Sequence, residues 1–257
     1  MKCTIVVATH KAYRMPQDPC YLPLHVGKAG KESIGFAGDD TGENISTQNP
    51  YYCELTGLYW LWKNNTSDYK GLVHYRRHLG GGTGGKDPWK RILTQDQLEQ
   101  MLATSDVLLP KKRRYYIESL YSHYAHTHYA QHLDATREIL VTQCPEYLPA
   151  FDRVMRRTWG HMFNMFVMSR EKCDGYCAWL FPILKQLEQR VDYRSLDSFQ
   201  ARLFGRVSEL LLDVWLETKG YTYRELPVVS MEPVNWWRKG TSFLRAKFSG
   251  KKYGSSF

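Results

Sequence analysis

Two arginines and two histidines stand together at residues 74–78, at the end of a short apolar segment. The centre of that segment, Gly71-Leu72-Val73, predicts a buried strand over Tyr69–Tyr75. His74-Tyr75-Arg76-Arg77-His78 then places cationic groups at the carboxyl end of the strand. Ligands of open α/β sheets bind beyond such strand ends, and guanidinium groups bind phosphate through paired hydrogen bonds. The pattern predicts a phosphate site; the alternative is a solvated strand end whose arginines pair with Asp or Glu.

A buried helix is predicted immediately before this strand. Asn49 is a good N-cap, Pro50 suits the first helical position, and Asn64-Asn65 favours a turn at the end. Apolar residues recur at helical spacing between them: Leu55, Leu58, Tyr59 and Trp62. The helix and strand together form the segment around which the rest of the chain is organised.

A polar stretch with three carboxylates, residues 38–46, precedes the helix. It contains Asp39-Asp40, Glu43 and Asn44. One interpretation is a solvated loop with an Asx turn. The other is a loop that binds a sugar, a ribose or a metal ion.

The remaining elements alternate between strands and helices, which predicts a single α/β domain. Thr4–Ala8 predicts a first buried strand that ends at Thr9-His10, and residues 11–35, with their prolines and glycines, predict a long loop. Later segments predict further elements: a capped helix from Thr94, strands at Asp106–Pro110, Phe163–Met168 and Pro227–Val229, and helices at Cys173–Val191 and Phe204–Leu216. We expect this domain to span residues 1–235.

Histidines are frequent in the aromatic, mainly helical stretch 115–160, at positions 123, 126, 128 and 132. A zinc site there would need a further ligand, and packing of the rings is the alternative. The six cysteines lack C-x-x-C pairing, which indicates free thiols in a reducing cytosol. No apolar run is long enough to span a bilayer, and no signal peptide is recognisable.

Short motifs along the chain together resemble a bacterial family. They are Ala8-Thr9-His10-Lys11, Asp39-Asp40-Thr41-Gly42-Glu43-Asn44-Ile45-Ser46, Asn49-Pro50-Tyr51-Tyr52-Cys53-Glu54-Leu55-Thr56, Gly71-Leu72-Val73-His74-Tyr75-Arg76-Arg77 and Asn164-Met165-Phe166. In this order they resemble the capsular and exopolysaccharide glycosyltransferases grouped as domain of unknown function 4422. The resemblance implies a GT-A-like fold with a central, mainly parallel sheet flanked by helices. It also implies transfer of a hexose, galactose or galactofuranose, from a UDP-linked donor to a lipid-linked polysaccharide-repeat acceptor.

The resemblance also implies site residues. Donor-binding positions would be Ala8, Thr9, His10, Asp39, Asp40, Asn44, His74, Tyr75, Arg76 and Arg77. Acceptor- or sugar-binding positions would be Tyr52, Glu54, Asn164 and Met165.

Metal dependence is an open question, because the chain departs from the usual GT-A pattern. No D-x-D motif, which holds a divalent Mn or Mg ion in most such enzymes, occurs anywhere in the sequence. Arg76 and Arg77 could stabilise the leaving diphosphate directly. Asp39 and Asp40 would be the obvious carboxylates for a metal.

An inverting transferase needs a general base opposite the leaving group. Glu209, in Ser208-Glu209-Leu210-Leu211, resembles the acid that plays this part at the start of a late helix in related folds. The family pattern has a basic residue after that acid, where this chain has Leu210. His161 is the alternative base, and a structural role is the alternative for both.

The net charge of +9 allows other function classes. A nucleic-acid-binding protein or nuclease would use Lys111-Lys112-Arg113-Arg114 and the tyrosines, but no nucleic-acid motif is present. A non-catalytic carbohydrate-binding domain would explain the aromatic residues but not the paired arginines.

The last segment, residues 236–257, is predicted to be a basic aromatic tail. It has six cations and no acid, together with Trp236, Trp237, Phe243 and Phe248. Aromatic and cationic side chains suit an anionic membrane surface. We therefore expect a cytoplasmic protein that binds peripherally to the inner face of the cell membrane.

Overall fold

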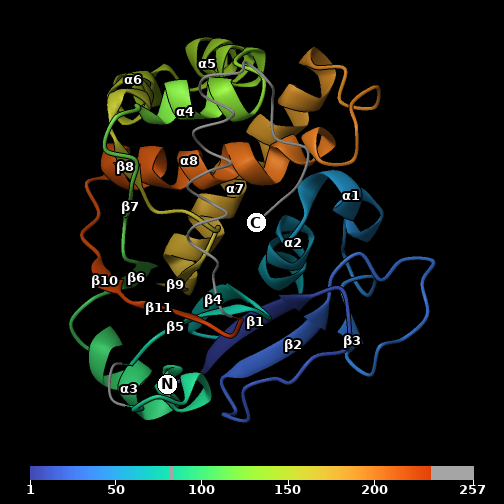
Figure 1. Cartoon of the computed structure of the whole chain (residues 1–257), viewed down its shortest axis with the longest axis vertical. Coiled ribbons are helices and arrows are strands. Elements are labelled where there is room, and N and C mark those ends of the chain that lie inside the picture. The colour runs from blue at the N-terminus through green and yellow to red at the C-terminus, as the bar shows by residue number, and fades with distance from the viewer. Residues whose placement is uncertain (82–83, 233–257) are drawn as a thin grey trace.

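A nine-stranded mixed sheet forms the base of the molecule in the computed structural model, which describes residues 1–81 and 84–232 (Figure 1). The main path of the sheet has the order β10-β6-β9-β4-β1-β2-β3, and β5 joins β4 to β11. The strands are β1 Cys3–Thr9, β2 Tyr21–His25, β3 Ala37–Gly38, β4 Tyr69–His74, β5 Arg77–Leu79, β6 Val107–Pro110, β9 Phe166–Ser169, β10 Arg224–Leu226 and β11 Val228–Ser230. The predicted tail, residues 236–257, lies outside the described residues.

Seven of the nine strands of this sheet run in the same direction. The pairs β1–β2, β1–β4, β2–β3 and β6–β10 are parallel, whereas β9 runs antiparallel to both β4 and β6, and β5 runs antiparallel to β4 and β11. The predicted α/β fold is therefore confirmed as a mixed, mostly parallel sheet flanked by helices.

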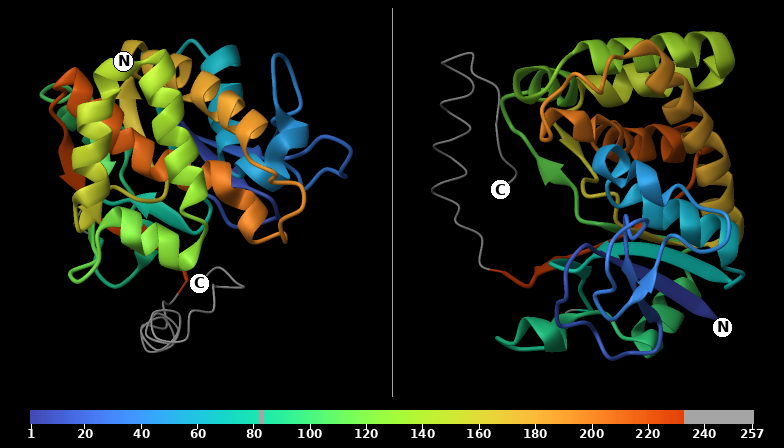
Figure 2. Two further views of the ribbon diagram at one scale, coloured as in Figure 1. Left: turned by 90° about the horizontal axis from the view of Figure 1, so that it is seen from above. Right: turned by 90° about the vertical axis from the view of Figure 1, so that its right-hand side faces the viewer.

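Helices cover both faces of the sheet, but unequally. They are α1 Asn49–Tyr52, α2 Leu55–Asn64, α3 Gln95–Leu102, α4 Leu120–Thr127, α5 Gln131–Gln143, α6 Leu148–Arg156, α7 Arg170–Arg190 and α8 Leu203–Lys219. Helix α3 lies on one side, and the others form a thick layer on the opposite side, with α4, α5 and α6 farthest from the sheet (Figures 1 and 2). A two-stranded ribbon, β7 Arg113–Arg114 with β8 Trp159–Gly160, lies beside one end of α8, at the edge of this helical layer (Figure 1).

Strand β1 is buried on both faces of the sheet. Val6 and Ala8 belong to the large core under α2, α7 and α8, whereas Ile5 and Val7 belong to the smaller core that includes residues of α3. A strand buried on both faces has an almost continuous apolar sequence, as Ile5–Ala8 has. Because β1 and β4 are parallel neighbours, the polar residues that follow each strand lie at the same edge of the sheet.

Several of the predicted boundaries were wrong. The strand predicted from Phe163 begins only at Phe166, because Phe163 and Asn164 have positive φ and form a turn. The strand predicted over Pro227–Val229 corresponds to β11, which begins only at Val228, and Pro227 separates it from β10.

The helix predicted over residues 49–64 is interrupted at Cys53, whose φ of 54° and ψ of −129° leave the helical region, and Asn49 lies inside α1 rather than capping it. The end at Asn64 is confirmed. Residues 11–35 are not a continuous loop, because β2 pairs with β1 there. Strand β3 pairs only with Leu24 and His25 of β2. At Pro23 the outer side of β2 therefore has no partner strand, and such an edge position tolerates proline.

None of the helices in the described ranges combines the length and the apolar character needed to cross a bilayer. The capping box predicted at Thr94 is confirmed, with Gln97 as its partner. The strand predicted at Asp106–Pro110 and the two long helices predicted near 173–191 and 204–216 are also present, as β6, α7 and α8.

A buried lysine, Lys70, allows the contribution of one ion pair to the stability of the fold to be tested. Lys70 on β4 has only 1% of its side chain exposed, and its Nζ donates to Asp174 Oδ1 on α7 at 2.7 Å. Asp174→Ala would leave a buried ammonium without its carboxylate, so we predict a loss of about 2–3 kcal/mol of unfolding free energy. Urea unfolding measures it. Asp106→Ala is the control, since its pair with Lys172 is more exposed, and an equal loss in both variants would contradict the prediction.

Candidate functional site

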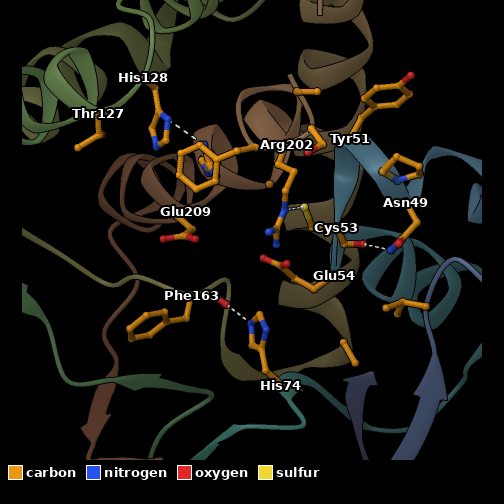
Figure 3. A pocket seen from close by; sticks show the side chains of 18 of the residues that line it. Asn49, Tyr51, Cys53, Glu54, His74, Thr127, His128, Phe163, Arg202 and Glu209 are labelled. Carbon is orange, nitrogen blue, oxygen red and sulfur yellow. Dashed lines mark hydrogen bonds between the residues drawn. The ribbon is translucent and has the colours of Figure 1, made fainter. Parts of the chain in front are cut away.

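A cavity of about 1060 Å³ lies beyond the carboxyl ends of β1 and β4, under α1 and the first turns of α8 (Figure 3). Arginines dominate the charged residues that line it: Arg76, Arg77, Arg113, Arg114, Arg194, Arg202 and Arg206. The carboxylates among the lining residues are Glu54 and Glu209. This excess of cations around two acids makes the cavity a candidate site for an anionic ligand.

The parallel pairing of β1 with β4 brings two of the predicted motifs to one edge. Ala8 is in register with His74, and the Tyr75 N–H donates to the Ala8 carbonyl at 3.1 Å. The His10 ring packs edge-on against Tyr75 with 5.3 Å between the ring centroids. Ala8, His10, His74 and Tyr75 all line the cavity, at the sheet edge where the sequence predicts a ligand.

Arg76 and Arg77 follow at the start of β5 and also line the cavity. Arg76 Nη1 lies 3.3 Å from Glu232 Oε2, and the Arg77 guanidinium stacks on the Phe163 ring at 4.8 Å from its centroid. Burial, and then the charge of Arg76, lowers the pKa of Arg77. An anionic ligand would offset both the repulsion between these two adjacent cations and the cost of their partial burial.

The turn before β9 holds the centre of the cavity together. Phe163 and Asn164 both have positive φ, 81° and 51°. The buried Asn164 amide donates to Glu54 Oε1 at 2.6 Å and to the Gly205 carbonyl at 2.8 Å, and its Oδ1 accepts from Ser208 Oγ at 2.8 Å. One side chain thus ties the α1–α2 junction and α8 to the sheet.

The ring of His74 is held by the same turn. Its Nε2 donates to the Phe163 carbonyl at 2.6 Å (Figure 3). Burial lowers the pKa of His74, while Glu54 and this hydrogen bond oppose the change. Burial thus favours the neutral imidazole, and the bond to the Phe163 carbonyl keeps a proton on Nε2.

Glu209, on the first half of α8, extends into the cavity, and Glu54 approaches the same space from the α1–α2 junction (Figure 3). Burial raises the pKa of Glu209 to about 7, the charge of Glu54 adds to the rise, and a hydrogen bond with the Phe163 backbone opposes it. A carboxyl group poised near neutral pH can accept or donate a proton there.

Several functional groups were missed by sequence reasoning. Cys53 accepts a hydrogen bond at its Sγ from Arg202 Nε at 3.1 Å, and burial raises the pKa of the thiol to about 11, so it stays neutral. Arg206 Nη1 donates to His128 Nδ1 at 2.8 Å. Arg202 immediately precedes α8, and Arg206 and Glu209 follow it within the helix at spacings of four and three residues, which suits one side of the helix. That spacing is the signal that could have identified them.

The predicted Asp39-Asp40 pair does not line the cavity. Asp39 is fully buried, and its carboxylate accepts from the backbone N–H groups of Gly27 and Lys28 and from the Ser46 hydroxyl. Asp40 is exposed and lies 3.8 Å from Lys28. Asp39 thus anchors its own loop, and the two acids do not converge as metal ligands.

Other predicted residues also lie away from the cavity lining. Thr9 is buried and donates to the Lys11 carbonyl, and Asn44 caps its own turn through Ser46. The buried Tyr52 hydroxyl donates to Glu188 at 2.7 Å, and Met165 is fully buried in the smaller core. Asn164 is buried as well and reaches the cavity through its bond to Glu54.

His161 is enclosed on the far side of α8 rather than in the cavity. Its ring is fully buried, with Nδ1 2.5 Å from Asp213 Oδ1 and Nε2 3.0 Å from Glu225 Oε1. Burial opposes its charge, but the bonds to the two carboxylates outweigh burial and raise the pKa of His161. With both nitrogens engaged, this side chain is placed to join α8 to β10 and not to reach a substrate.

Glu118 engages two of the four histidines considered for zinc. Its carboxylate lies 3.0 Å from His123 Nδ1 and 2.8 Å from His126 Nδ1. Within residues 1–81 and 84–232, no group of three or more His, Cys, Asp or Glu side chains is arranged to hold a metal ion.

Comparison with known proteins identifies the family of this chain. Residues 4–220 match the family described as "Domain of unknown function (DUF4422)". The chain belongs to this family. The DUF4422 chain also resembles a solved structure, the apo form of the WbbM bifunctional glycosyltransferase, with 31% sequence identity and a TM-score of 0.84. The match covers 91% of this chain and 46% of the other, so this chain spans about half the length of that protein. No curated protein matches it.

The environment of Glu209 in this DUF4422 chain predicts a dependence of stability on pH. Its pKa in the folded state, about 7, lies above the ordinary value of 4.5, so the unfolded chain binds fewer protons between these values. Stability should therefore fall through this site as the pH rises from about 4.5 to 7. Glu209→Gln removes the titration, so the variant should gain stability relative to wild type over that range. Thermal unfolding at several pH values measures the difference, and a constant difference would contradict the prediction.

Proposed function

We propose that this chain is a glycosyltransferase with a GT-A-like fold. It would transfer a hexose from a nucleotide-diphosphate donor, UDP-linked, to a hydroxyl group of a lipid-linked polysaccharide-repeat acceptor. The observation that carries the proposal is a single cavity combining Arg76 and Arg77 with Glu209, whose pKa is raised to about 7. The similarity to the WbbM glycosyltransferase supports the reaction class. The family resemblance supports UDP, and galactose or galactofuranose, as the donor.

The donor diphosphate would lie at the carboxyl end of β4. There Arg76 and Arg77 offer charge-assisted hydrogen bonds to its oxygens, and His10 lines the same edge. Negative charge grows on the diphosphate as the glycosidic bond to the anomeric carbon breaks. Cations fixed in advance lower the energy of that transition state because they need not reorganise.

Glu209 would be the general base. The acceptor oxygen forms the new bond to the anomeric carbon, the old bond to the donor phosphate breaks, and the acceptor proton moves to Glu209. The acid lies across the cavity on α8 rather than at the sheet edge, which favours attack opposite the leaving group and hence inversion. Glu54, fixed by Asn164, is placed to accept a hydrogen bond from a sugar hydroxyl.

The described residues do not fit a metal ion on the diphosphate. Asp39 is saturated with hydrogen bonds, Asp40 pairs with Lys28, and neither lines the cavity. Stabilisation of the charge on the diphosphate would therefore come from the arginines.

The alternative of nucleic-acid binding is less favoured by this arrangement. Its cations line a cavity that also contains two carboxylates, whereas a nucleic-acid site follows the backbone along an extended basic surface. Thermal shift with UDP, UDP-hexoses and an oligonucleotide, with and without manganese, tests the class. Stabilisation by UDP compounds alone supports the proposal, and stabilisation by the oligonucleotide alone rejects it.

Removing the stacked arginine should weaken donor binding. A charged hydrogen bond contributes about 1.5–3 kcal/mol, so Arg77→Ala should raise the Kd for UDP by roughly tenfold or more in calorimetry. Arg76→Ala should have a smaller effect, because Glu232 already competes for that side chain. Arg190→Ala is the control, since Arg190 pairs with Glu138 on the outer helices. Unchanged affinity in both strand-end variants would reject the donor site.

Removing the base should affect turnover and not donor binding. Glu209→Gln should lower kcat by roughly 10²–10⁴-fold, the usual contribution of a general base, and leave the Kd for UDP unchanged. In wild type, kcat/KM should rise with pH through about 7, as the carboxyl group loses its proton. Release of UDP in the presence of acceptor measures both. Glu146→Gln, an exposed change, is the control, and wild-type turnover in Glu209→Gln would reject the assignment.

A further inference from the structure

Two large apolar side chains are exposed next to each other beside the cavity. Tyr116 is 80% exposed and Ile117 is 65% exposed. The other large apolar side chains exposed in the described ranges, Met1 and Val141, are isolated and less exposed. Arg113, Arg114 and Tyr115, the three residues just before Tyr116, line the cavity. The exposed pair therefore lies at the rim of the candidate site.

Tyr116 and Ile117 lie in a segment that is held by backbone hydrogen bonds. Lys111 N–H donates to the Leu226 carbonyl at 2.8 Å, β7 pairs with β8, and Tyr115 N–H donates to the Thr158 carbonyl at 2.7 Å. A tight turn follows, in which Ile117 N–H donates to the Tyr115 carbonyl at 2.6 Å and Tyr116 has a φ of 58°. After the pair, Leu120 N–H donates to the Arg157 carbonyl at 2.7 Å, so backbone hydrogen bonds hold the segment on both sides of the two exposed side chains.

The same segment is strongly cationic. Lys111, Arg113 and Arg114 are exposed, and both arginines belong to the ribbon that leads to the apolar tip. The nearest acids along the chain and across the sheet are already engaged, since Glu118 is buried against two histidines and Glu225 pairs with Lys112. The exposed surface of residues 111–117 therefore combines positive charge with a small apolar tip.

We propose that residues 111–117 dock on an anionic lipid bilayer. Tyr116 and Ile117 enter the headgroup boundary, and Lys111, Arg113 and Arg114 bind lipid phosphates, as amphipathic interfacial segments do. The rim of the cavity then faces the membrane surface. Tyr116 and Ile117 do not line the cavity, so substitutions there test the docking separately from the transfer reaction.

The chemistry favours a bilayer over a protein partner. A stable protein interface buries about 800 Å² on each partner and needs a well-packed apolar centre, which two adjacent side chains do not supply. A lipid surface needs no matching shape, and a few inserted apolar groups together with clustered cations are enough to strengthen binding to it.

Sedimentation of the full chain with phosphatidylcholine vesicles, with and without phosphatidylserine, tests the proposal. We expect salt-sensitive binding only to the anionic vesicles. The double variant Tyr116→Ser/Ile117→Ser should lower the partition coefficient by about tenfold, because it removes two inserted apolar groups. Its melting temperature should not change, since both side chains are exposed. Val141→Ser, an exposed apolar residue on α5, is the matched control and should bind as wild type does.

Three results would overturn the proposal. Wild type could fail to bind either vesicle, or bind neutral vesicles as well as anionic ones. The double variant could also bind as tightly as Val141→Ser, which would place membrane binding elsewhere on the chain. None of these results bears on the transferase proposal, which is decided by UDP affinity and turnover.

Discussion

The buried amide of Asn164 is the contact on which the cavity depends. The residue adopts a positive φ, which is costly for a non-glycine side chain, and it persists because both ends of its amide are hydrogen bonded. Those bonds join the turn before β9 to the α1–α2 junction and to α8. The neighbouring Phe163 carbonyl fixes His74 on β4. Segments separated by more than a hundred residues are thereby held in one geometry, which is what a preorganised site requires.

The charges around that framework explain the directions of the pKa shifts. Burial raises the pKa of Glu209 and lowers the pKa of Arg77, because both groups lose contact with water. The shifts would be smaller if the acid and the cation formed a direct pair. Instead, the cations lie along the walls, and the proton-accepting group keeps a pKa near neutrality. An anionic ligand between them would pair with the arginines, and as a like charge it would add to the rise in the pKa of Glu209.

The parts of the fold that sequence could predict are those fixed by local rules. The apolar run Ile5–Ala8, the turn at Asn64 and the capping box at Thr94 each follow from residues close in sequence, and each prediction holds. The break at Cys53 could not be predicted in this way. It lies at the cavity, where Arg202, far away in the chain, bonds its thiol. Likewise, Asp39 resembled a ligand residue because its bonds to Gly27, Lys28 and Ser46 cannot be seen in sequence.

Helix α8 shows how a site can be hidden in a core element. Leu203, Phe204, Val207, Leu210 and Leu211 pack into the large core, so the helix has the pattern of a purely structural element. Its remaining narrow side carries Arg202, Arg206 and Glu209 toward the cavity. Close packing fixes the backbone of the helix, and the hydrogen bonds of Arg202 to Cys53 and of Arg206 to His128 orient those side chains. The position of Glu209 thus follows from its leucine neighbours. From the residues alone, the same leucines leave a helix-surface position open for Glu209, and it was the resemblance to related folds that indicated it as a base.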